Sequence, residues 1–90
     1  EQSIANGGTY TICSSGEGGL FALRDDQGNF GLLYLFTGPL QSEVADPFNV
    51  FSFIAGTGSS WNLYITGGNI TIQNNRGSTR TISIARLAGG

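Results

Sequence analysis

Carboxylates are the only side chains in this sequence that could act as acid–base catalysts. The chain contains no histidine and no lysine, which excludes a serine–histidine–acid triad, a cysteine–histidine dyad and a Schiff base. A pair of acids about 5 to 10 Å apart could still hydrolyse a glycosidic bond. Five of the six acids, however, lie in segments typical of loops and turns, which favours solvated carboxylates: Glu17, Asp25, Asp26, Glu43 and Asp46. We therefore predict no catalytic residue and a protein that is not an enzyme.

The sequence also predicts no metal site and no cofactor. Zinc sites built on histidine are excluded with the histidines themselves. The segment DDQGN at residues 25–29 lacks the alternating acids and the closing glutamate of a calcium loop, so we expect a hairpin turn there. Cys13 is the only cysteine, which rules out a disulfide within the chain, and its strand-like surroundings predict a buried thiol.

Aromatic residues near amides are the clearest binding signal in the chain. An aromatic ring stacks on the apolar face of a sugar while amides and carboxylates bind its hydroxyls. The predicted ligand-binding residues are Tyr10, Asn62, Tyr64, Asn74, Asn75 and Arg76. The alternative is that they are ordinary surface and turn residues, since scattered exposed aromatics are common.

Composition excludes two other classes of partner. Four arginines against six acids give a net charge of −2, which cannot hold nucleic acid by counterion release. No apolar stretch approaches the roughly 20 residues of a membrane span, so no membrane insertion is expected. A chain of 90 residues fits one domain, residues 1–90.

The elements that would position these residues are β-strands. Apolar and polar residues alternate in short runs bounded by glycine, asparagine and aspartate, whereas no window has a helical period. The predicted strands are 10–14, 20–24, 29–37, 48–55, 61–66, 69–73 and 79–87, with 38–46 as a loop or crossover and the last three strands as a meander. Seven to eight short antiparallel strands predict an all-β sandwich of the jelly-roll type, and a small closed barrel is the alternative.

Two of these strands are apolar on both sides. Residues Phe30, Leu32, Tyr34 and Phe36 share one side of their strand and oppose Leu33 and Leu35, while Phe51 and Phe53 oppose Val50 and Ile54. A second apolar face needs either a covering loop or another subunit. We favour a subunit and predict an oligomer interface at Leu33, Leu35, Phe51 and Phe53. The alternative is that the 38–46 loop, with Leu40 and Val44, covers the face.

The end of the chain has a recognisable pattern. In WNLYITGGNITIQNNRGSTRTISIARL, a strand leads through Gly-Gly to a strand ending in Asn-Asn, then to Gly-Ser and a Thr-rich final strand. The earlier segments IANGGTYTI and GGLFALRDDQGNFGLLYLF fit the same outline. This pattern resembles small β domains of bacteriophage tail fibres, tail tips and head fibres, and it covers nearly the whole chain.

The resemblance implies a jelly-roll knob, similar to the heads of the tumour-necrosis-factor and complement families, which forms a homotrimer on a viral fibre or spike. We therefore expect a virion structural domain on the extracellular particle that contacts other virion proteins and attaches to a host-surface glycan. The resemblance carries no ligand-binding residue. The alternatives are a capsid decoration or head-fibre protein without a ligand, and a free sugar-binding lectin.

Overall fold

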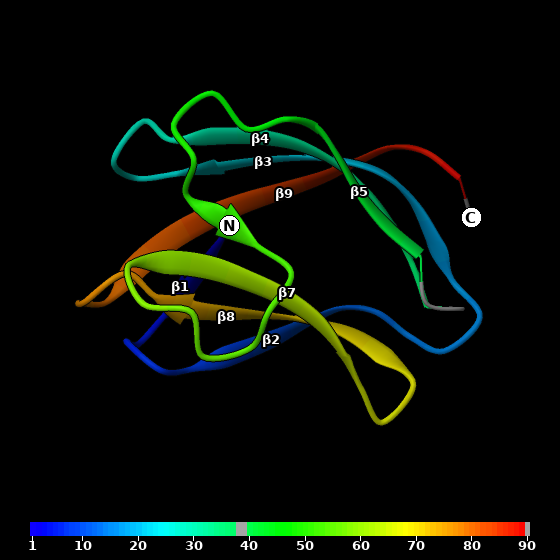
Figure 1. The fold of residues 1–90 in the computed structure, drawn as a ribbon, viewed down its shortest axis with the longest axis horizontal. Coiled ribbons are helices and arrows are strands. Elements are labelled where there is room, and N and C mark those ends of the chain that lie inside the picture. The colour runs from blue at the N-terminus through cyan, green and yellow to red at the C-terminus, as the bar shows by residue number, and fades with distance from the viewer. Residues whose placement is uncertain (38–39, 90) are drawn as a thin grey trace.

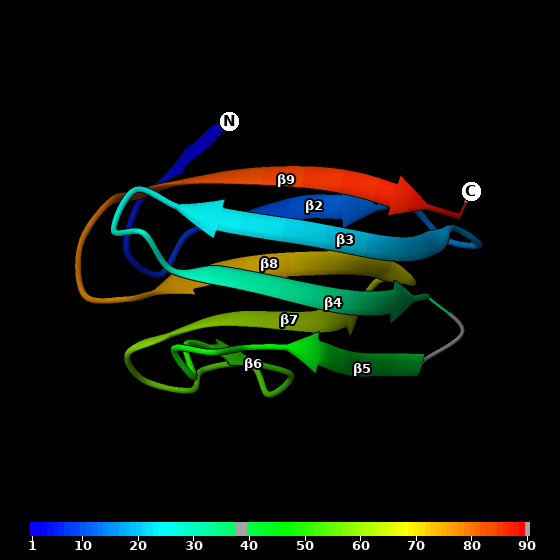
Figure 2. The same ribbon diagram turned by 90° about the horizontal axis from the view of Figure 1, so that it is seen from above.

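The fold is a sandwich of two β-sheets, which confirms the all-β class (Figures 1 and 2). The computed structural model describes residues 1–37 and 40–89, and the side chains of 1–37 and 44–89. The strands of this part of the chain are β1 (Gln2–Ile4), β2 (Thr9–Cys13), β3 (Gly18–Asp25), β4 (Phe30–Phe36), β5 (Leu40–Ala45), β6 (Phe51–Ser52), β7 (Ser60–Thr66), β8 (Asn69–Asn75) and β9 (Arg80–Ala88). None of these residues belongs to a helix long and apolar enough to cross a membrane.

The first sheet has the strand order β1-β9-β3-β4-β5, and the second has the order β2-β8-β7-β6. The strand pairs described are antiparallel apart from β6 with β7. The two ends of the chain wind together as in a jelly roll, because β1 and β2 lie in different sheets and pair with β9 and β8. The middle of the chain differs, since β3, β4 and β5 follow one another within the first sheet.

Both hairpins expected from the turn residues form. Strands β7 and β8 are joined by Gly67 and Gly68, whose φ angles of 58° and 80° suit a two-residue turn that only glycine enters without strain. Strands β3 and β4 are joined by the segment 26–29, closed by a hydrogen bond from the Asp25 amide to the Asn29 carbonyl. The second hairpin brings two long apolar strands side by side.

Three expectations about the strands are wrong. The predicted 38–46 loop contains β5, which pairs along β4 and extends the sheet edge; residues 38 and 39 of that prediction lie outside the described residues. The predicted strand 48–55 shrinks to β6, because the Asp46 carboxylate accepts hydrogen bonds from the amides of Val50 and Phe51 and holds the preceding segment in a turn. Strand β9 does not extend the β7–β8 hairpin but enters the first sheet between β1 and β3.

The core lies between the sheets and contains side chains from both. Its fully buried large residues include Trp61, Leu63, Ile70 and Ile72 of the second sheet and Leu23, Leu33, Leu35 and Ile82 of the first. The predicted oligomer interface is therefore placed on the wrong side of the strand for Leu33 and Leu35, and Phe51 is also a core residue at 5% exposure. Phe53 is half-buried and packs against this same core. These side chains stabilise the single chain.

Candidate functional site

The predicted sugar-binding amides are used within the chain itself. Asn74 is fully buried; its Nδ2 donates to the carbonyls of Ile4 and Ser78, and its Oδ1 accepts from the Arg76 amide. These bonds tie the end of β1 and the β8–β9 turn to the end of β8. Asn74 is therefore a structural residue of this fold.

Asn62 and Asn75 hold the loop between β6 and β7. Both donate from Nδ2 to the carbonyl of Thr57, at 3.0 and 2.9 Å, and Asn62 also donates to Gln73 Oε1. Asn62 is fully buried although its side chain points away from the core, because this loop lies over it. The Oδ1 atom of Asn62 has no hydrogen-bond partner among the described atoms. An incoming sugar would have to displace the loop to reach these amides.

The remaining candidates do not meet in space. Arg76 donates to the Ser59 carbonyl and to Gln27 Oε1, which again binds the chain to itself. Tyr10 lies opposite Ile72 in the second sheet, whereas Tyr64 lies opposite Thr71, so the two tyrosines project from opposite faces. The structure therefore does not assemble the six predicted residues into one site.

Among the acids, Asp25 differs from the expectation. It was predicted to be a solvated turn residue, but it is only 5% exposed. Its Oδ2 accepts from the indole Nε1 of Trp61 and from Asn29 Nδ2, both at 2.9 Å, and its Oδ1 accepts from the amides of Gln27 and Asn29. Burial acts to raise the pKa of Asp25, but these four hydrogen bonds outweigh it and hold the pKa below its usual value. Asp25 thus joins the two sheets as an ionised acceptor.

No metal-binding arrangement is found in the described part of the chain, where no three histidine, cysteine or acidic side chains come together. Cys13 is buried at 1% exposure, with Arg86 Nη2 3.5 Å from its sulfur. The Glu17 carboxylate accepts from the Ser14 amide within its own loop. These groups are accounted for by local structure.

The surface that local structure does not account for is the outer side of β3 and β4. Because Leu33 and Leu35 point into the core, the alternate residues of β4 point outward, and the register assigns the facing residues of β3 to the same side. We call this surface the aromatic face. It consists of Leu20, Ala22 and Arg24 of β3 and Phe30, Leu32, Tyr34 and Phe36 of β4.

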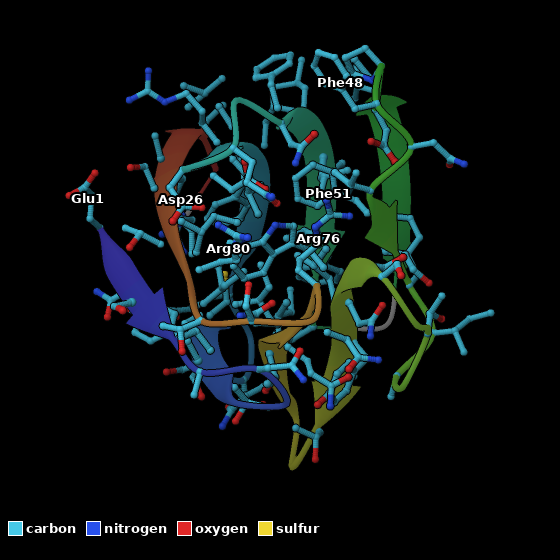
Figure 3. The ribbon with its side chains drawn as sticks, turned by 90° about the vertical axis from the view of Figure 1, so that its left-hand side faces the viewer. Glu1, Asp26, Phe48, Phe51, Arg76 and Arg80 are labelled. Atoms are coloured by element: carbon cyan, nitrogen blue, oxygen red, sulfur yellow. The ribbon has the colours of Figure 1, made fainter. Side chains whose placement is uncertain are left out.

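Its rings are accessible to solvent. Phe30, Tyr34 and Phe36 are 40%, 38% and 36% exposed. Figure 2 looks down on this face, and no described segment crosses β3 or β4. Phe48, at 58% exposure, lies on the outer side of β4 and β5 in Figure 3 and adds a ring at the border.

The predicted covering segment does not cover the aromatic face. Residues Leu40–Ala45 form β5, which lies beside β4 in the plane of the sheet. Val44 is 60% exposed, while the side chain of Leu40 lies outside the described residues. The described chain therefore leaves the second apolar side of β4 open.

Two hollows interrupt the aromatic face. One, of about 230 Å³, is bordered by Gly18, Gly19, Leu20, Tyr34, Phe36, Ala88 and Gly89. The other, of about 370 Å³, is bordered by Glu1, Ala22, Leu23, Arg24, Phe30, Ser83, Ile84 and Ala85. A side chain on Gly18 would have no room, because its Cβ atom would lie 2.7 Å from the Leu35 carbonyl oxygen and 2.8 Å from Cδ1 of Phe36, whose ring lies against Gly18 within the same chain.

The chemistry of this face is almost entirely apolar. Arg24 is the one charged side chain among its seven residues, and none of them is an amide or a carboxylate. Such a surface can bury rings and methyl groups of a partner, but it offers few groups that bind sugar hydroxyls. The alternation of Phe30, Leu32, Tyr34 and Phe36 was visible in the sequence. The sequence did not reveal which side of β4 would enter the core.

Comparison with known proteins gives no match: no family model fits the chain, and no curated protein or solved structure is significantly similar to it. The class that the fold and surface define is a β-sandwich with one exposed aromatic sheet face.

Proposed function

We propose that the chain is a non-enzymatic structural domain that works as an assembly of identical copies joined through the aromatic face. In this proposal it is a knob of a phage tail fibre or spike, which sits on the virion, contacts other virion proteins and attaches the particle to a host-surface glycan. The virion setting and a copy number of three rest on the sequence resemblance alone, and a three-fold arrangement would need a second patch on each chain besides the aromatic face. Self-association rests on the open apolar face.

The size of the aromatic face supports self-association. At about 200 Å² for a complete aromatic side chain, three rings exposed by 36–40% offer roughly 230 Å². The partly exposed Leu20, Leu32 and Ala22, together with Ala85 and Ala88 of β9, which the register places opposite Ala22 and Leu20, raise the apolar total to roughly 350 Å². A stable interface buries about 800 Å² per partner, of which about 60% is apolar. This side of the sheet therefore offers most of the roughly 480 Å² of apolar area that such an interface buries on each partner.

A second candidate function is sugar binding by a lectin or adhesin that acts without self-association. The exposed rings of Tyr34 and Phe36 favour it, because rings on a sheet can stack on sugars. The scarcity of hydrogen-bonding side chains on the aromatic face weighs against it. A capsid decoration protein without a ligand is compatible with self-association and differs from the knob only in its lack of glycan binding.

The proposal is tested by placing a charge on the aromatic face. Tyr34→Asp should convert an associated form into folded monomers, because a carboxylate would be buried among rings in the interface. Thr11→Asp is the control, since Thr11 is exposed on β2 of the other sheet and lies opposite Thr71, on the side that faces away from the core. The measurements are sedimentation for mass and circular dichroism for folding, followed by glycan binding of the parent and both variants.

Equal masses for the parent and Tyr34→Asp would contradict assembly through this face. A monomeric parent that binds a glycan, and loses that binding on Tyr34→Asp, would favour the lectin. An assembly that binds no glycan would favour the decoration protein.

A further inference from the structure

We infer that a second copy of the chain packs face to face on the aromatic face, with its β4 lying over β3 of the first copy. The inference rests on the proposed self-association and adds the geometry of the contact. It also replaces the expected three-fold arrangement with a two-fold one.

Side-chain size differs between the two strands of the aromatic face. In the register of the hairpin, Phe36 lies opposite Gly18, Tyr34 opposite Leu20 and Leu32 opposite Ala22. At each of these rungs the larger side chain is on β4 and the smaller is on β3. Over these three rungs the face therefore has a ridge along β4 and a trough along β3, whereas at the fourth rung Phe30 lies opposite the long side chain of Arg24.

This ridge and trough fit a second copy that is turned about an axis parallel to the strands and midway between β3 and β4. That rotation places β4 of each copy over β3 of the other, at the same level along the strands. The central rungs then match large on small: Leu32 of one copy contacts Ala22 of the other, and Tyr34 contacts Leu20. Stacked sheets pack about 10 Å apart and nearly aligned, which keeps the central rungs opposite one another.

The two hollows lie where the ends of the opposing ridge would enter. The 230 Å³ hollow lies beside the chain's own Phe36 ring, which contacts the Gly18 position. The space that remains, bordered by Gly19, Ala88 and Gly89, receives Phe36 of the second copy. The 370 Å³ hollow lies over Ala22 and Arg24, and it receives Phe30. The ridge thus fills spaces that the chain leaves open at both ends of its own trough.

Charge is compatible with this arrangement. Arg24 is opposite Phe30 within the hairpin, so the same rotation places Phe30 of the second copy over Arg24. An arginine over an aromatic ring is attracted by the ring, which avoids leaving the cation buried without a partner. A contact of this kind already occurs inside the chain, where Arg86 lies 5.3 Å from the centre of the Phe21 ring.

The symmetry follows from the surface being complementary to itself. A patch that fits a second copy of the same patch closes after two chains, because both copies use it completely. Three copies around one axis would each need two different patches. The predicted unit is therefore a dimer, or an assembly built from such dimers.

The test mixes two variants that alter opposite sides of one rung. Ala22→Leu places a large residue in the trough, so two copies of it oppose leucine with leucine. Leu32→Ala removes the ridge, so two copies of it leave a void. A mixed pair has one leucine over one alanine at both rungs. We expect each variant alone to dimerise on the order of 100-fold more weakly than the parent, and the mixture to form mixed pairs in clear excess over the half that random pairing gives.

Native mass spectrometry distinguishes the pairs, because the two substitutions change the chain mass in opposite directions. Thr66→Ala, on an exposed position of β7 in the other sheet, is the control and should mix at random with the parent. Circular dichroism confirms that each variant is folded before mixing.

The outcomes separate this inference from the proposed function. A parent that forms dimers, with excess mixed pairs, supports both. A parent that forms trimers, or dimers that pair at random, overturns the two-fold geometry and leaves self-association standing. A parent that remains a monomer overturns both, and binding of a glycan or of an unrelated protein to that monomer would assign the aromatic face to that partner instead.

Discussion

Replacing Asp25 with asparagine tests how the two sheets are joined beneath the aromatic face. The carboxylate accepts four hydrogen bonds, two at each oxygen, and one of them comes from Trp61 in the other sheet. Asparagine has the same shape, but it presents an NH₂ group to two of these donors. Two bonds to a charged acceptor are then lost, and the donors that made them face an NH₂ group that cannot accept a hydrogen bond.

The magnitude follows from those bonds. Each hydrogen bond to a charged group contributes about 1.5 to 3 kcal/mol, so Asp25→Asn should lower the free energy of unfolding by at least about 3 kcal/mol. A chain of this length has about 5 to 13 kcal/mol in total. At about 4 to 8 °C for each kcal/mol, the melting temperature should fall by about 12 °C or more.

Urea unfolding followed by fluorescence is the assay, because Trp61 is the only tryptophan and is fully buried in the fold. Asp26→Asn is the control, since the neighbouring Asp26 is exposed and its 3.9 Å ion pair with Arg80 contributes less than about 1 kcal/mol. A double-mutant cycle with Trp61→Phe, followed by circular dichroism, should give a coupling energy of about 1 to 2 kcal/mol between Asp25 and Trp61.

Lowering the pH should remove the contribution of the Asp25 carboxylate to the free energy of unfolding. The pKa of Asp25 is lower in the folded than in the unfolded chain, where an aspartate has a pKa of about 3.9. Its stabilisation is therefore complete above about pH 5 and is lost as the pH falls through the folded pKa. The difference between the parent and Asp25→Asn should narrow over that range. If the free energies of unfolding of the parent and Asp25→Asn differ by less than about 0.5 kcal/mol at pH 7, or by an amount that does not change with pH, Asp25 does not stabilise the fold by joining the two sheets.

Two further predictions concern the sides of β4. Gly31→Ala should lower the free energy of unfolding by about 1 to 3 kcal/mol, because the new Cβ would lie 2.5 Å from the Phe51 ring. The control is Gly58→Ala, which has open space around the new Cβ and should change the free energy of unfolding by less than about 0.5 kcal/mol in the same urea titration. Leu35→Ala should lower the free energy of unfolding of the monomer by about 2 to 5 kcal/mol, whereas Phe36→Ala, which removes a ring that is 36% exposed, should lower it by less and should also weaken association. Equal effects of the last two on monomer stability would contradict the assignment of inside and outside.

The sequence was sufficient to predict elements with local signals. The β7–β8 hairpin follows from alternation around Gly67 and Gly68, and the β3–β4 hairpin follows from the turn residues after Asp25. Strand β5 was missed because its apolar pattern is weak and its partner β4 supplies the pairing. The position of β9 was missed because β9 pairs with β1 and β3, which are distant from it in the sequence, and no local pattern indicates that pairing.

The sequence predicted the residue types of the candidate site but not where those residues lie in the fold. Two apolar sides on β4 were visible, but the side that enters the core is chosen by the opposite sheet, and the rings went outward while Leu33 and Leu35 went inward. The amides at Asn62 and Asn74 had the residue types of a binding site. Asn62 donates to the carbonyl of Thr57 in the preceding loop and Asn74 donates to that of Ile4 at the far end of the chain, and no periodicity reveals such contacts.

Sedimentation equilibrium of the unmodified chain, from about 1 µM to about 1 mM, tests most directly whether the aromatic face is covered by another copy. The mass should rise with concentration from the 9.4 kDa of one chain to that of a pair. A mass of one chain at every concentration would contradict it, since the exposed rings of β4 would then have no copy of this chain as their partner.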